Sequence, residues 1–275
     1  GHFGEECIQA YFQKLRDESF SVLSDEYKND FTNFDGNAQT FRVLRKLGPS
    51  SDEFSYNLTY PVLACIIKYP YSSTSGNKNN GKISQKKFSY FQSEKDDFKE
   101  ISQTLQLDTR RHPLVFLLEA ADDIAYSVSD IEDGCKKGII TRDILYSEIE
   151  KFNDAKFVSA EKKILGKIEK DIPKDHPSNF ILVIQRYRIN SHSAMLQAAS
   201  KCFIDNLDRI VSGEFDKDLM KTSEAAPLRE LFKKLGKKNF DHESVLKREL
   251  AGQAALNFLL KTFFEAIFSD ERKNL

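Results

Sequence analysis

The sequence predicts an all-α protein. Almost every stretch of periodic apolar residues has the spacing of a helix, and no stretch shows the convincing alternation of a β-strand. Of the 275 residues, 40% are hydrophobic, which is enough for a sizeable core. We therefore expect a single helical domain over residues 1–275, with a C-terminal helical portion at 140–275.

The N-terminal part predicts several helices and one loop. Apolar residues recur at helical spacing across residues 5–30, and a shorter helix is expected at 38–47, before a glycine-proline pair. A further apolar run covers residues 56–68. Residues 72–82 are rich in Ser, Gly and Asn, which predicts a mobile loop inside the domain. A short helix near residues 94–104 follows.

The predicted helices of the C-terminal portion cover residues 142–153, 159–170, 179–212, 227–235 and 243–268. The first two are strongly charged, so we expect them at the periphery. Gly213 and Gly236 follow the third and fourth helices at positions where glycine commonly ends a helix. The last helix is the most apolar and would suit a subunit interface.

A helix from about residue 113 to 134 carries an unusual acidic face. Projected as a helix, five polar side chains fall within about 80° of one another: Glu119, Asp122, Tyr126, Asp130 and Asp133. The opposite side carries Leu114, Leu117, Ala121, Ile124, Val128 and Ile131. No Lys or Arg occurs between Leu114 and Cys135, so this face needs a cation, a basic partner or a ligand unless it is simply solvated surface.

Composition limits the class of protein. The net charge of −1 gives no global preference for nucleic acid or membrane, and no apolar run reaches the roughly 18 residues of a membrane span. The four cysteines are isolated, without a CxxC pair, which argues against a zinc site or a disulfide framework. A reducing cytoplasm is the expected location.

Three short stretches carry candidate polar chemistry. His2 and Glu5 share a face at a helix start, where a carboxylate can orient a histidine; the alternative is a solvated histidine. Asn37 lies in the string FDGNAQTFR, which is otherwise an N-capped loop. Lys68 and Lys87 each adjoin an aromatic residue beside the polar loop and could hold phosphates, although solvated lysines are commoner.

Together these strings resemble a known family. GHFGE, FDGNAQTFRVLRKL, KYP, KKFSYFQSE, HPLVFLLEAADDIAYSVSDIEDG and ELAGQ, in this order, are similar to the deoxyguanosine triphosphate triphosphohydrolases of the HD-domain superfamily. The resemblance extends to about residue 265. It implies a multi-helix HD-domain-like bundle and hydrolysis of dGTP, or of other dNTPs, to the deoxynucleoside and tripolyphosphate.

The resemblance also implies roles for single residues. It makes His2 the catalytic histidine and Glu5 its supporting carboxylate, and it makes Asp122 a ligand of a divalent metal ion, whether manganese, magnesium or iron. The substrate contacts that it implies are Asn37, Lys68, Lys87, Tyr126 under the deoxyribose, Asp130 at the 3′-hydroxyl and Glu249 near the base. The choice of Lys87 over Lys86 is arbitrary at this stage.

One departure from the family is evident. The family's first metal histidine and its His-Asp doublet precede the GHFGE string, and here nothing precedes it. We therefore expect a segment of a longer enzyme that is inactive by itself. The alternative is a non-catalytic helical scaffold or oligomerisation segment. The resemblance further implies a homo-oligomer, and single-stranded nucleic acid is a possible partner that the charge does not support.

Overall fold

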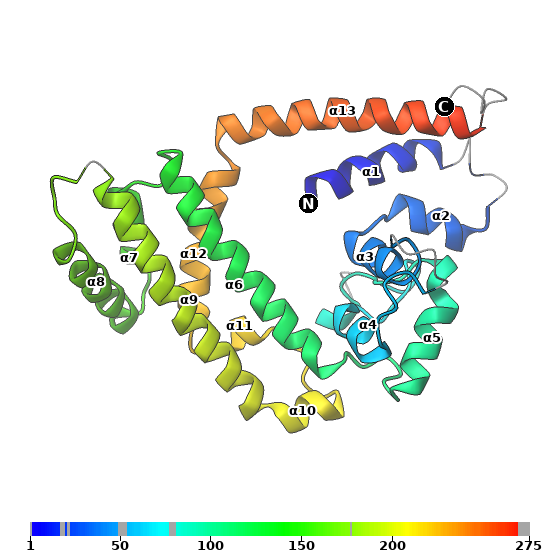
Figure 1. Ribbon diagram of the computed structural model, residues 1–275, viewed down its shortest axis with the longest axis horizontal. Helices are drawn as coiled ribbons and strands as arrows, with labels where there is room; N and C mark the ends of the chain where they lie inside the picture. The colour runs from blue at the N-terminus through cyan, green and yellow to red at the C-terminus, as the bar shows by residue number, and fades with distance from the viewer. Residues whose placement is uncertain are drawn as a thin grey trace. The chain divides into compact units, whose positions relative to one another are not determined.

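The computed structural model describes residues 2–16, 20, 23–48, 54–76, 81–176 and 178–268. Within them it contains thirteen α-helices, two 3-10 helices and no strand, and the only pairing of β type is an isolated bridge between Ser72 and Tyr90 (Figure 1). The all-α prediction is confirmed. Among these residues no helix has both the length and the apolar character that crossing a membrane would require.

The chain divides into two compact units, one of residues 1–115 and 247–275 and the other of residues 116–246. The prediction of a single domain over residues 1–275 stays a prediction, and so does the mobility of the 72–82 loop, of which residues 77–80 lie outside the described part.

The first unit contains five helices and most of α13. Their bounds are α1 His2–Leu15, α2 Asp25–Thr32, α3 Gly36–Arg45, α4 Tyr60–Ile66, α5 Lys95–Thr104 and α13 Glu243–Phe268. The 3-10 helices are Ile83–Gln85 and Gln92–Glu94. Aromatic rings join α1, α2 and α13, because Phe12, Phe20 and Phe264 lie within 6.2 Å of one another and Phe31 stacks on Phe20 at 5.0 Å.

The helical periodicity across residues 5–30 is not one helix. α1 ends at Leu15, and α2 begins at Asp25 after an extended Ser24. The intervening Phe20 is only 3% exposed because its ring packs against Phe12 and Phe31. The apolar spacing in this stretch therefore includes a buried residue, Phe20, that belongs to neither helix.

The second unit contains most of α6 and all of α7 to α12. Their bounds are α6 Pro113–Lys136, α7 Arg142–Glu150, α8 Ala155–Lys170, α9 Asn179–Asp205, α10 Leu207–Ser212, α11 Leu219–Thr222 and α12 Ala226–Phe240. One apolar core joins them. The charged helices near 142–153 and 159–170 each bury one face in that core, where Leu145, Ile149 and Leu165 are fully buried, and their peripheral position stays a prediction.

Two predicted helix boundaries in this unit differ from the structure. The stretch 179–212 forms two helices, because Asn206 leaves the helical conformation and its side chain donates to the carbonyl of Cys202 at 2.8 Å. Gly213 ends α10 with a φ of 82°, as predicted. Gly236 does not end α12. It is buried inside the helix, and a Cβ there would lie 3.5 Å from Asp130 Oδ2, which is an ordinary contact distance.

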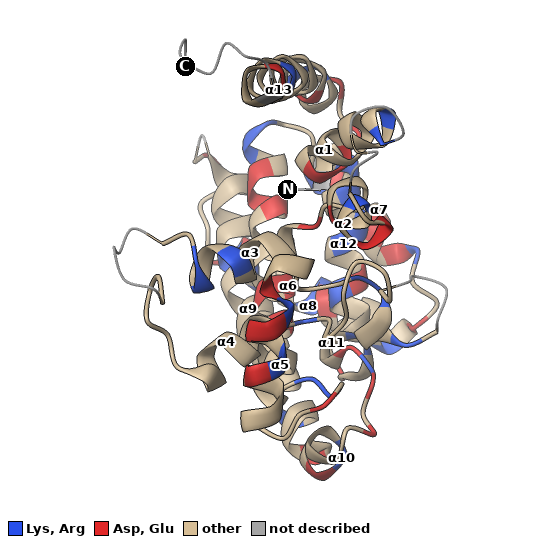
Figure 2. Cartoon of the chain, turned by 90° about the vertical axis from the view of Figure 1, so that its right-hand side faces the viewer, with Lys and Arg blue, Asp and Glu red and all other residues tan. Residues whose placement is uncertain are grey.

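The four cysteines are free thiols. Cys7, Cys135 and Cys202 are buried and Cys65 is half-buried. Acidic and basic residues are scattered over the ribbon (Figure 2), and the net charge is −1.

Candidate functional site

In the first unit, a lysine lies between two carboxylates. The Lys87 Nζ atom is 3.0 Å from Asp35 Oδ2 and 3.4 Å from Glu5 Oε2. All three side chains are at least four-fifths shielded from solvent. Burial by itself would lower the pKa of Lys87, but the Asp35 and Glu5 carboxylates outweigh it and leave that pKa above its usual value. The ammonium therefore stays charged at neutral pH, and it screens the two carboxylates from each other.

The start of α3 holds both carboxylates in place. Asp35 is the N-cap of this helix, and its Oδ1 accepts hydrogen bonds from the Asn37 backbone N–H at 2.8 Å and from Asn37 Nδ2 at 2.7 Å. Glu5 Oε1 accepts from the Gly36 N–H at 3.2 Å. A helix N-terminus favours negative charge, so this geometry suits two carboxylates at the same helix start. The result brings Glu5, Asn37 and Lys87 into one cluster.

Gly36 makes this approach possible. A Cβ at this position would lie 2.7 Å from Glu5 Oε1, which is closer than real Cβ atoms come. We therefore expect Gly36→Ala to push the Glu5 carboxylate away from α3 and to lower turnover by about tenfold, with little loss of stability, because the glycine occupies a helical position. Turnover and thermal unfolding of the whole protein would measure this. Gly4→Ala is the matched control, since a Cβ there meets nothing within 4 Å.

In the second unit, α6 presents the predicted acidic face. Ile124, Val128 and Ile131 are at most 3% exposed in the core, whereas Asp122 is exposed and Tyr126 is 69% exposed. The helix is rotated slightly from the predicted orientation, because Leu114 and Ala121, placed on the apolar side by the projection, are exposed.

Asp130 differs from the rest of this face. It is half-buried, and burial followed by repulsion from Asp133 raises the pKa of its carboxyl above the usual value, although Lys137 opposes the shift. The Asp130 carboxylate can accept a hydrogen bond from a neutral hydroxyl group.

Other carboxylates on α6 are compensated by cations from helices far along the chain. Asp123 forms a hydrogen-bonded ion pair with Arg229 of α12. Glu132 pairs with Arg188 of α9 at 3.0 Å and with Lys136 of α6 at 2.7 Å. The missing cations of the α6 sequence are therefore partly supplied by tertiary contacts, which periodicity does not reveal.

Comparison with known proteins relates the sequence to a family. No family model matches the chain. In an alignment of 276 positions that covers 97% of the chain, it is 32% identical to a deoxyguanosinetriphosphate triphosphohydrolase-like protein of Listeria monocytogenes. The resemblance to the deoxyguanosine triphosphate triphosphohydrolase family is confirmed.

Two further relatives carry similar names. A deoxyguanosinetriphosphate triphosphohydrolase-like protein of Synechocystis is 31% identical over 98% of the chain, and a deoxyguanosinetriphosphate triphosphohydrolase of Yersinia pestis is 27% identical over 99%. The chain spans 58% to 61% of the length of these three relatives. The HD superfamily is consistent with this relationship, while the position of the chain relative to the HD doublet stays a prediction.

Three further residues have roles that the family resemblance implies. His2 is the first residue of α1, and its side chain lies outside the described part. Lys68 is half-buried just after α4, and Glu249 is half-buried on α13. The role assigned to each stays a prediction.

Sequence reasoning missed Asp35 as a member of the site. The turn pattern around it indicates a helix cap, although an N-cap carboxylate next to Gly36 and Asn37 is also a signal for an anionic centre at this helix start. Its contact with Lys87 joins two stretches separated by 52 positions, and spacing along the chain does not predict such a contact.

The described residues do not fit a metal ion by themselves. Among them no group of three or more His, Cys, Asp or Glu side chains could hold one. A divalent cation needs several donors, and Asp122 offers one exposed carboxylate on α6. Asp122 would therefore be one of several ligands of such an ion, and the described residues do not supply the others.

Proposed function

We propose that the whole protein hydrolyses dGTP to the deoxynucleoside and tripolyphosphate. It would hydrolyse other deoxynucleoside triphosphates in the same way to the extent that its contacts with the base are weak. The observation that carries this proposal is the gathering of Glu5, Asn37 and Lys87 into one cluster. These residues come from three separate strings of the family resemblance. The names of the relatives support the same activity and do not favour a purely non-catalytic scaffold.

The cluster suits a proton-transfer role supported by charge. In the proposal, Glu5 orients His2, which acts as general acid or base at the scissile P–O bond. Lys87 and the start of α3 fix both oxygens of the Glu5 carboxylate. The partly exposed Lys87 ammonium, together with Lys68 and the Asn37 amide, contacts the triphosphate, and Glu249 contacts the base.

The exposed face of α6 suits recognition of a deoxynucleoside. Asp122, Tyr126 and Asp130 lie on successive turns, about 6 Å apart along the axis. In the proposal, Tyr126 lies under the deoxyribose and excludes a 2′-hydroxyl, and Asp130 binds the 3′-hydroxyl. Asp122 is the one ligand that the described residues contribute to a divalent ion, whether manganese, magnesium or iron, and such an ion would neutralise charge on the α-phosphate.

The test is turnover of the four dNTPs by the whole protein with Mn²⁺, Mg²⁺ and Fe²⁺ separately, scored by the release of tripolyphosphate. We expect tripolyphosphate from dGTP and no stepwise release of orthophosphate. Absence of tripolyphosphate with every metal and every dNTP would remove the proposed activity.

We expect Tyr126→Ala to admit GTP. Removal of the ring opens the space that a 2′-hydroxyl would occupy, so the ratio of kcat/KM for dGTP over GTP should fall by at least an order of magnitude. Because Tyr126 is 69% exposed, its loss should leave the unfolding temperature almost unchanged. Tyr27→Ala, which truncates a tyrosine that is 45% exposed, is the control. An unchanged dGTP preference would exclude Tyr126 from selection of the sugar.

A homo-oligomer and a cytoplasmic location belong to the same proposal. Large apolar side chains of α13 remain 47% to 69% exposed, which suits an interface between copies: Leu246, Leu250, Phe258, Leu259, Phe263 and Ile267. Light scattering on the whole protein would measure the assembly. The free thiols agree with a reducing compartment. Binding of single-stranded nucleic acid stays a prediction from the family resemblance.

A further inference from the structure

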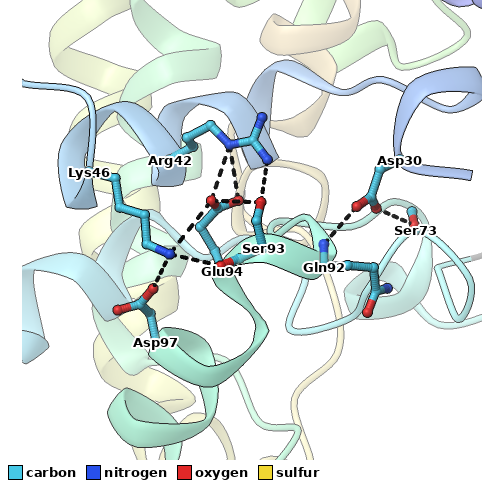
Figure 3. A network of polar contacts seen from close by, with 8 residues as sticks. All are labelled: Asp30, Arg42, Lys46, Ser73, Gln92, Ser93, Glu94 and Asp97. Atoms are coloured by element: carbon cyan, nitrogen blue, oxygen red, sulfur yellow. Dashed lines mark hydrogen bonds and ion pairs between the residues drawn. The ribbon is translucent and has the colours of Figure 1, made fainter. Parts of the chain in front are cut away.

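The carboxylate of Asp30 connects two stretches that are separated in sequence. Asp30 lies on α2 and is 7% exposed. Its Oδ1 accepts a hydrogen bond from Ser73 Oγ at 2.6 Å, and its Oδ2 accepts one from the Gln92 backbone N–H at 2.7 Å (Figure 3). One buried side chain therefore holds both ends of the segment between Ser73 and Gln92, in which Lys87 lies.

These ends also contact each other. We call residues 69–76 the first stem and residues 87–92 the second stem. The Ser89 N–H donates to the Tyr71 carbonyl at 3.2 Å, the Tyr69 N–H donates to Ser89 Oγ at 3.0 Å, and an isolated bridge joins Ser72 to Tyr90. The two stems are thus paired with each other, and Asp30 contacts one residue of each stem.

The pairing extends to the backbone of Lys87 itself. A Cβ on Gly76 would overlap the Lys87 carbonyl oxygen, so the backbones of the two stems are in direct contact there. A shift of the first stem therefore moves Lys87.

The second stem has a separate anchor beyond Gln92. Arg42 Nε donates to both carboxylate oxygens of Glu94 at 3.1 Å, and Lys46 donates to the Ser93 carbonyl at 2.7 Å (Figure 3). These contacts fix residues 93–94 to α3. They do not involve the first stem, whose link to α2 is the Ser73 contact with Asp30.

We propose that Asp30 is a positioning residue that holds Lys87 between Glu5 and Asp35 by tying the first stem to the second. It acts through the stems and touches neither Lys87 nor the triphosphate. This inference rests on the proposed function only for its effect on turnover, because the effect on the stems can be measured without substrate.

The first experiment measures the position of Lys87 directly. Trypsin cleavage after Lys87 is followed by mass spectrometry in the native whole protein and in its Asp30→Ala and Ser73→Ala variants. Both variants should be cut there at least tenfold faster, because each removes the link between the first stem and α2, and the paired stems move together. Asp25→Ala, which removes an exposed carboxylate of the same helix, should be cut at the native rate. Native rates in both Asp30→Ala and Ser73→Ala would overturn the proposal.

The second experiment separates positioning from general stability. Displacement of a catalytic group by about 1 Å can cost on the order of a hundredfold in rate, so we expect Asp30→Ala to lower kcat for dGTP by about tenfold to a hundredfold. In a Lys87→Gln background the same change should cost less than about threefold, because the group that it positions is already removed. An equal loss in both backgrounds would show a purely structural role and overturn the proposal.

Two further variants distinguish the loss of these hydrogen bonds from misfolding. Asp30→Asn keeps an acceptor for the Gln92 N–H and a donor for Ser73, so it should restore most of the activity. Ser73→Ala removes only the first-stem contact and should lower kcat in the same coupled way even if Asp30→Ala does not fold. If Lys87→Gln leaves turnover unchanged while the cleavage result holds, Asp30 positions Lys87 but the role of Lys87 in the proposed function fails.

Discussion

Replacement of Asp122 by alanine in the whole protein is expected to abolish metal-dependent release of tripolyphosphate from dGTP. Asp122 is the one ligand that the described residues contribute to the proposed metal ion, and a cation site that loses a carboxylate loses both charge and geometry. The loss should exceed about a thousandfold in kcat/KM, because the charge on the α-phosphate would no longer be neutralised. The measurement is turnover over a range of Mn²⁺ concentrations.

The exposure of Asp122 separates a loss of metal binding from a loss of stability in this experiment. The side chain is exposed on α6, so truncation opens no cavity and the unfolding temperature should stay within a few degrees of the native value. Asp96→Ala removes a carboxylate that is 99% exposed in the first turn of α5 and should leave turnover intact. Native turnover by Asp122→Ala at saturating metal would show that this residue is not a ligand.

Replacement of Glu5 by glutamine should have the next largest effect. Glutamine has nearly the same shape and can still accept from the Gly36 N–H, but its amide nitrogen would face the Lys87 ammonium, and it cannot stabilise a charged histidine. A positioned proton donor contributes on the order of 10²- to 10⁴-fold to a rate. We expect kcat to fall within that range while KM changes little.

The control for this change is the next residue in the same helix. Glu6 is exposed on α1, so Glu6→Gln makes the same chemical change on the solvent side and should leave kcat unchanged. The pH profile is a second readout, because removal of the Glu5 carboxylate should lower the pKa of the general acid or base and shift the profile toward acid. An unaltered kcat and pH profile would remove Glu5 from the reaction.

Much of the helical framework could be predicted because its causes are local. The spacing of Ile124, Val128 and Ile131 predicted the buried side of α6, and Gly213 predicted the end of α10 through its left-handed conformation. The family strings likewise placed Glu5 and Lys87 in the same site, and the structure brings these two side chains into contact.

The sequence predictions that differ from the structure depend on contacts between elements far apart in the chain. Gly236 was expected to end a helix because glycine often does, but it is a buried residue inside α12, which continues to Phe240. The break between α1 and α2 is hidden because Phe20 continues the apolar spacing while it packs in a connection. Asp123 is compensated by Arg229, 106 positions away, and Asp30 binds Ser73 and Gln92, at 43 and 62 positions. Spacing along one element carries no information about such pairs.

The burial of the cysteines has a practical consequence for fluorescence work. Desolvation raises the pKa of the Cys135 thiol to about 12, and it also raises the pKa of Cys65 and Cys202. Maleimide reagents attack the thiolate, so these groups should label slowly at neutral pH, and Cys7 is shielded at 4% exposure. A cysteine introduced at the exposed Asp96 or Glu6 should therefore take up a single dye in the native background, without prior removal of the natural thiols.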